Sequence, residues 1–209
     1  MSFFDDSVPP IRRKPTNLKL APHEKLWDVT YSMGKHQFYS TFYTRPDGAC
    51  LFWALLLIPI FVIPQFFSVS WRPMAVLSSG SGLVGLAMMV YFAHIWVKLQ
   101  RVIWVLYCWV ILIVMGLVLT DLAIFLGWGG VLINLCSLWL GLCAIGYWCT
   151  GLAVHSRAII GVGFVHLFAI GILPYVGGWL FLFTGTVMVL SLLILAEFRW
   201  DMISASVEK

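Results

Sequence analysis

The stretch YFAHIWVKLQRVIWVLYCW, residues 91–109, places His94, Lys98 and Arg101 between two long apolar runs. Three polar side chains grouped in this way could form a binding site inside a protein core. They could also mark the point at which a chain that crosses a lipid bilayer turns around in water. The composition of the whole chain distinguishes these two interpretations.

The composition is too apolar for a water-soluble domain. Of the 209 residues, 61% are hydrophobic and only 11% are charged, whereas about 25% of the residues in a typical soluble domain are charged. A domain of this length could not bury so much apolar surface in a core of its own. The sequence therefore predicts an integral membrane protein.

Six apolar runs are separated by short polar turns. A helix that spans a bilayer needs roughly 20 apolar residues, with a range of about 17–25. The run at 158–173 is short and is followed by Pro174, so an arrangement of five spans is the alternative. The predicted fold class is an all-α polytopic bundle of six transmembrane helices. The six runs cover residues 49–69, 74–97, 102–126, 130–154, 158–173 and 177–198.

The basic residues predict the orientation of the bundle. With six spans, twelve of the 13 Lys and Arg residues fall on one side of the membrane, and Arg72 alone falls on the other. Basic residues concentrate in cytoplasmic loops, so both termini are expected in the cytoplasm, in a bacterial inner membrane or a thylakoid-type membrane. Lys98 and Arg101 then mark a cytoplasmic turn, and no ligand is needed to explain them.

The segment before the first span divides into two parts. Residues 1–21 contain three prolines and few large apolar residues, which predicts a disordered or extended arm. Residues 22–48 are interpreted as an amphipathic segment that begins as a helix at Pro22, bends at Gly34, and either lies on the membrane surface or docks another protein. The bundle then covers 49–198, and 199–209 form a cytoplasmic tail. The expected docking residues are Leu26, Trp27, Val29, Met33, Phe38 and Phe42.

His166 is the most isolated titratable residue within the spans. It lies nine residues beyond Arg157, or roughly 13 Å into the bilayer at 1.5 Å per residue. One interpretation is a neutral imidazole that is hydrogen-bonded between helices. The alternatives are a haem or chlorophyll ligand, or a group that relays protons. His94 and His155 lie near turns and are weaker cofactor candidates.

Three further polar residues lie near the outer ends of spans, namely Gln65, Asp121 and Asn134. Together with His166 they could line a transport path. They could also join helices by hydrogen bonds, which average only about 0.6 kcal/mol in measured membrane proteins. No cofactor follows directly from these residues.

Small residues predict where helices approach closely, because lipid provides no hydrophobic drive for helix association. The five cysteines form no CxxC pair and are expected to be free thiols. No metal site is predicted from the sequence. The predicted packing residues are Ser78, Ser81, Gly82, Gly85, Gly141, Gly146 and Gly151.

The sequence leaves the function open among three classes of membrane protein. The chain has no HExxH, P-loop or paired-carboxylate motif. Its outer turns are short, polar residues within the spans are few, and the arm before the first span is rich in aromatic residues. A non-catalytic subunit or assembly factor of a larger membrane complex is therefore the leading hypothesis. The alternatives are a small-solute transporter or channel protomer, and a haem- or pigment-binding protein. The expected partners are the lipid bilayer and other membrane subunits, in a homo- or hetero-oligomer, and not nucleic acid.

Overall fold

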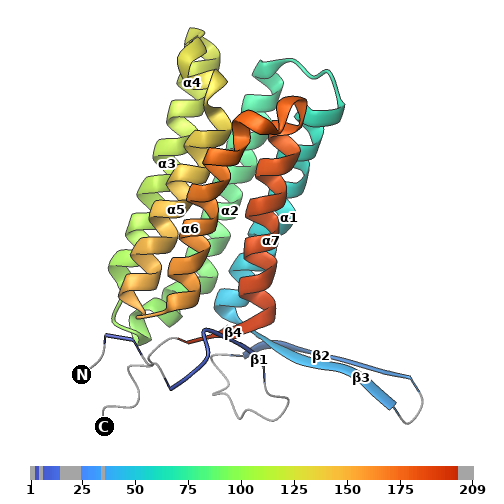
Figure 1. Cartoon of the computed structure of the whole chain (residues 1–209), viewed down its shortest axis with the longest axis vertical. Helices are drawn as coiled ribbons and strands as arrows, with labels where there is room; N and C mark the ends of the chain where they lie inside the picture. Colours follow the sequence, from blue (N-terminus) through green and yellow to red (C-terminus); the bar gives the residue numbers. More distant parts are fainter. Residues whose placement is uncertain (1–2, 5–6, 15–24, 34–35, 202–209) are drawn as a thin grey trace.

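The structure of the protein is a computed structural model that describes residues 3–4, 7–14, 25–33 and 36–201 (Figure 1). Six of its helices are long and apolar enough to cross a membrane. This confirms the predicted all-α bundle and makes the chain a multi-pass membrane protein. The six helices are α1 (Arg45–Phe66), α2 (Trp71–Leu99), α3 (Ile103–Leu126), α5 (Leu135–Ala153), α6 (Arg157–Ile172) and α7 (Leu180–Glu197).

The last two apolar runs form two complete spans. Helix α6 is followed by two 3₁₀ turns, η1 (Leu173–Tyr175) and η2 (Gly177–Trp179), and then by α7. Pro174 falls in the first of these turns, where its fixed φ angle and missing N–H are tolerated. The preferred arrangement of six spans is therefore confirmed over the alternative of five. A short helix, α4 (Gly129–Ile133), lies between α3 and α5.

The helices form a ring in which most neighbours in sequence are neighbours in space. Helix α1 packs against α2 and α7, α3 packs against α2 and α5, and α6 packs against α5 and α7. The turns 100–102 and 154–156 lie at the same end of the bundle as strands β1 (Ile11–Arg13) and β4 (Phe198–Trp200), while α4 lies at the opposite end (Figure 1). We call the end with these strands the terminal end. That it faces the cytoplasm stays a prediction.

Over residues 25–33 and 36–44 the predicted amphipathic helix does not form. The chain instead forms the antiparallel strands β2 (Lys25–Met33) and β3 (His36–Thr44), and this hairpin extends away from the bundle (Figure 1). The prediction was wrong because the short stripe of apolar residues fits a helix, whereas the aromatic and β-branched residues of both segments favour strands. Residues 22–24 and 34–35 lie outside the described part.

The two ends of the chain meet in a second pair of strands. Strand β1 pairs antiparallel with β4, with Arg12 opposite Arg199. Residues 11–13 of the predicted arm are thus extended, and the first residues of the predicted tail are part of a strand. Residues 15–21 and 202–209 lie outside the described part of the chain.

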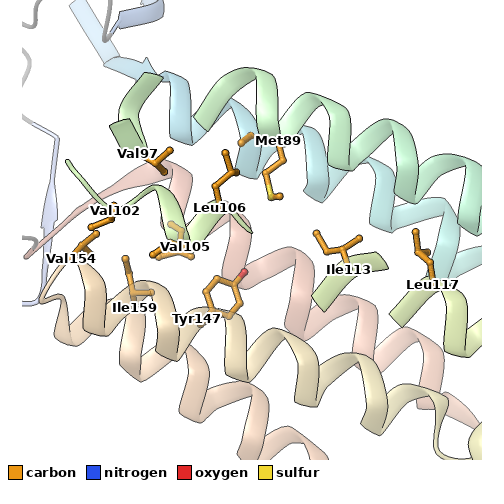
Figure 2. Packing of buried hydrophobic residues seen from close by; sticks show 12 residues of the cluster. Met89, Val97, Val102, Val105, Leu106, Ile113, Leu117, Tyr147, Val154 and Ile159 are labelled. Atoms are coloured by element: carbon orange, nitrogen blue, oxygen red, sulfur yellow. The ribbon is translucent and has the colours of Figure 1, made fainter. Parts of the chain in front are cut away.

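The apolar core continues to the terminal end, where two turns pack against each other. Val97, Val102 and Val105, around the α2–α3 turn, lie close to Val154 and Ile159, around the α5–α6 turn (Figure 2). All five side chains are buried. The stretch that contains Lys98 and Arg101 is therefore a turn flanked by buried apolar residues, and both basic side chains are exposed.

Candidate functional site

A buried ion pair joins the amino-terminal segment to the terminal end. The ammonium group of Lys14 donates to Asp47 Oδ2 at 2.6 Å, to the Ala196 carbonyl at 2.6 Å and to the Phe42 carbonyl at 3.2 Å. The side chains of Lys14 and Asp47 are both 5% exposed. The lysine thereby uses all three of its donors and links β3, α1 and α7.

Asp47 also begins the first span. Its Oδ2 atom accepts from the Thr44 backbone N–H at 2.7 Å and from the Thr44 hydroxyl at 2.8 Å. Thr44 is the residue before α1, so this is one half of a capping box. Because β3 ends at Thr44 and α1 begins at Arg45, the hairpin joins the bundle without a flexible link.

A second carboxylate, that of Asp201, holds the start of α6. It accepts from the Ser156 hydroxyl at 2.8 Å, from Arg157 Nε at 2.8 Å and from the Ala158 backbone N–H at 3.3 Å. Burial by itself would raise the pKa of Asp201, but the hydrogen bonds from Arg157 and Ser156 outweigh burial and hold this pKa below its usual value of 3.8. The contact is therefore made by an ionised carboxylate.

The predicted docking residues occupy different environments in the hairpin. Leu26 packs against Gly48 at the start of α1, and Phe42 is buried. Trp27 and Val29 remain 44% and 40% exposed, and the Trp27 ring lies 6.0 Å from the Tyr43 ring on the other strand. The side chains of Met33 and Phe38 lie outside the described part of the structure.

The helix ring encloses a cavity of about 180 Å³ that begins at the terminal end and reaches the middle of the bundle. Its wall is mainly apolar and aromatic, with Tyr147, Thr150 and His166 as its principal polar residues. Figure 2 shows the Tyr147 ring extending from α5 toward the interior of the bundle. Five tryptophans line the cavity, namely Trp53, Trp96, Trp109, Trp139 and Trp200.

Three of these tryptophans are fixed by hydrogen bonds from their ring N–H groups. Trp109 donates to the Thr150 hydroxyl at 2.9 Å, Trp139 to the Thr120 hydroxyl at 3.2 Å, and Trp200 to the Leu195 carbonyl at 2.7 Å. Fixed aromatic side chains give the cavity a defined shape. The ring N–H of Trp53 is buried and has no such partner.

A smaller cavity of about 80 Å³ continues from the first toward the other end of the bundle. The two cavities share part of their walls, including Trp53, Leu57 and Met188. Since α1, α3, α5 and α7 each contribute to both walls, the two cavities follow the centre of the helix ring.

His166 is fully buried and lies in the wall of the larger cavity. Its Nδ1 atom is 2.9 Å from the Val162 carbonyl of the same helix, and its Nε2 atom has no hydrogen-bond partner. The imidazole ring lies 5.0 Å from the Tyr147 ring. Among the described residues, His166 is the only histidine with a buried ring nitrogen that has no hydrogen-bond partner.

The other three residues of the predicted transport path each form a hydrogen bond, and only that of Asn134 is within one short segment. Gln65 donates to the Gly178 carbonyl at 2.9 Å, Asn134 to the Gly130 carbonyl at 2.9 Å, and Asp121 accepts from the Ser79 hydroxyl at 2.8 Å. None of the three lines either cavity described above. Between residues 36 and 201, no hydrogen bond joins any two of the four.

The remaining histidine candidates do not approach the cavity. His94 lies half-buried on α2, and the His155 ring lies 4.3 Å from the Phe3 ring at the α5–α6 turn. Neither lines the cavity that contains His166. The described ranges contain no group of three or more His, Cys, Asp or Glu residues placed to hold a metal ion.

The predicted packing residues differ in how closely they approach a neighbour. A Cβ atom would lie 2.9 Å from Leu117 if added at Gly82, 2.8 Å from Trp53 at Gly85, and 2.6 Å from Trp109 at Gly146. At Gly151 it would lie 2.8 Å from the backbone nitrogen of Ile160 on α6, whereas at Gly141 nothing lies closer than 3.9 Å. Ser78 donates to the Ala75 carbonyl of its own helix, and Ser81 is half-buried.

The residues at the terminal end were not identified from the sequence. In the sequence, Lys14 is simply one of the twelve basic residues on one side of the membrane, and its partner Asp47 lies 33 positions away. Thr44 and Asp47, at the first and fourth positions of TRPD, are a signal for a helix start that could have been recognised. No local pattern relates Asp201 to Ser156, which lies 45 residues earlier.

Comparison with protein-family models, with curated proteins and with solved structures gives no match for this chain. Its function must therefore be inferred from its own residues.

Proposed function

We propose that this chain is a non-catalytic subunit or assembly factor of a larger membrane complex, and that it docks a protein partner through the β2–β3 hairpin. One observation carries the proposal. The hairpin extends from the bundle as a pair of strands (Figure 1), and an isolated two-stranded hairpin is at best marginally stable in water. A protein that covers its exposed residues would supply the missing contacts.

The base of the hairpin suits such a role because it is held firmly. Leu26 packs on Gly48, Lys14 bonds to both Phe42 and Asp47, and Tyr43 donates to Glu197 at 3.0 Å. A partner bound farther along the strands would thus be positioned relative to the bundle. Exposed Trp27 and Val29 provide apolar area for contact, and tryptophan is enriched at energetically important interface positions.

The carboxylates at this end support a structural role. Asp47 is engaged by Lys14 and Thr44, and Asp201 by Arg157 and Ser156. A general acid or base must be free to exchange a proton with a substrate. These two groups instead serve as fixed acceptors that hold chain segments together.

Site-specific photo-crosslinking in cells tests the proposal. A photoreactive amino acid at Trp27 should give a discrete adduct with one protein, which mass spectrometry identifies. The same amino acid at Ile11, a 49% exposed residue of β1, is the matched control and should not give that adduct. Double substitution Trp27→Ser/Val29→Ser should reduce recovery of the same protein by about tenfold in mild detergent.

Three results would contradict docking of a protein at the hairpin. Adducts to lipid alone from Trp27 would make the hairpin a membrane-surface element and would refute docking of a protein. Equal adducts from Trp27 and Ile11, or unchanged recovery with the double variant, would also contradict the proposal.

A further inference from the structure

The hydrogen bond at Nδ1 fixes the tautomer of His166. A carbonyl oxygen only accepts, so Nδ1 must carry the proton that it donates to Val162, at 2.9 Å. A charged imidazolium in apolar surroundings would be costly without a paired carboxylate, and the described residues provide His166 with none. In the neutral ring Nε2 is therefore an acceptor.

This acceptor is buried but unused. His166 is 0% exposed, and no described group donates to Nε2. Leaving a buried polar atom unsatisfied is unfavourable, and most such atoms in folded proteins have a partner. His166 lines the cavity, and since Nδ1 is bonded to the backbone of α6, Nε2 is the ring nitrogen left for a ligand.

The cavity fits a small aromatic molecule. Its volume of about 180 Å³ is slightly greater than that of the engineered 150 Å³ cavity that binds benzene. Trp109, Trp139 and Tyr147 present aromatic rings to it, and such rings favour edge-to-face or offset contacts with another ring. A porphyrin contains four pyrrole rings, so haem or chlorophyll would require the helices to separate.

We propose that the larger cavity is a binding site for an apolar molecule of the size of a substituted phenol, and that the ligand's hydroxyl donates to His166 Nε2. A hydroxyl is both a donor and an acceptor. It therefore suits a wall that offers an unused acceptor at His166 and an unused donor at Trp53 Nε1. This binding site is independent of the docking role proposed for the hairpin.

The test compares two ligands of nearly equal shape, para-(trifluoromethyl)phenol and para-(trifluoromethyl)toluene. Fluorine NMR of the full chain in mild detergent measures the binding of each, and protein-free micelles correct for partitioning. The phenol should bind roughly tenfold more tightly, equivalent to about 1.4 kcal/mol. His166→Asn, which keeps a donor near Nδ1 but removes the acceptor at Nε2, should abolish that preference while both ligands still bind.

Two further variants keep the test decisive. His94→Asn alters a histidine outside the cavity and should retain the preference. Cys143→Phe, which fills part of the cavity from α5, should weaken binding of both ligands at least tenfold. Equal affinity of the wild-type chain for the two ligands would overturn the proposal. So would a preference that persists in His166→Asn, or binding that Cys143→Phe leaves unchanged.

Discussion

The ion pair between Lys14 and Asp47 allows a quantitative prediction. Lys14→Met removes the ammonium group and its three hydrogen bonds, and it leaves the carboxylate of Asp47 buried with only Thr44 as a partner. Removing one member of a buried pair typically costs 3–5 kcal/mol because the other charge is left uncompensated. No discount for solvent screening applies, since both side chains are 5% exposed. We expect the free energy of unfolding to fall by about 3–5 kcal/mol.

A double variant separates the buried charge from the lost contacts. Lys14→Met combined with Asp47→Asn leaves no buried charge, and the new amide oxygen can still accept from the Thr44 backbone N–H. The remaining loss is the two bonds from Lys14 to the Phe42 and Ala196 carbonyls, at about 1 kcal/mol each. The double variant should therefore be more stable than Lys14→Met, by about 1–3 kcal/mol.

Equilibrium unfolding in mixed micelles of increasing SDS fraction, followed by tryptophan fluorescence, measures these differences. The matched control is Arg13→Met, which removes an exposed basic residue next to Lys14 and should change stability by no more than about 0.5 kcal/mol. The reasoning is refuted if Lys14→Met unfolds within 1 kcal/mol of the wild-type protein, or if the double variant is as unstable as the single one.

Three other predictions concern separate contacts. Hydrogen bonds hold the pKa of Asp201 below its usual 3.8. The stability that this carboxylate contributes should therefore be complete above pH 3.8 and should be lost as the pH falls through its lower pKa in the folded state. Acid unfolding of Asp201→Asn should not show this loss of stability. Gly151→Ala should destabilise the bundle by about 1–3 kcal/mol in the same unfolding assay, because its Cβ would lie 2.8 Å from the α6 backbone. Gly161→Ala, where nothing lies within 4 Å, should be neutral or stabilising. Asp121→Ala and Ser79→Ala should each cost about 0.6 kcal/mol, and a much larger cost of combining them would contradict a simple interhelical hydrogen bond.

The spans could be predicted from sequence because length and hydropathy together are sufficient. Each run of about 20 apolar residues has to form a helix in lipid, since a helix satisfies its backbone hydrogen bonds internally. The hairpin could not be predicted in the same way. Over so short a segment, its apolar residues fit both the 3.6-residue period of a helix and the two-residue period of a strand. Contacts such as that of Leu26 with Gly48 depend on the folded bundle.

The candidate site was only partly predictable. The depth of His166 follows from counting residues along α6, but the cavity depends on how all six spanning helices surround it. The same limit applies to Lys14, whose acceptors include a carbonyl 182 residues away. Contacts of that separation leave no periodic pattern in the sequence.

The bonds of Lys14 also bear on the order of biogenesis. This residue is synthesised before the first span, yet one of its acceptors, the Ala196 carbonyl, belongs to the end of α7. Strand β1 likewise cannot pair until β4 has been synthesised. The segment that contains β1 and Lys14 can therefore take its final place only after α7 and β4 have been synthesised.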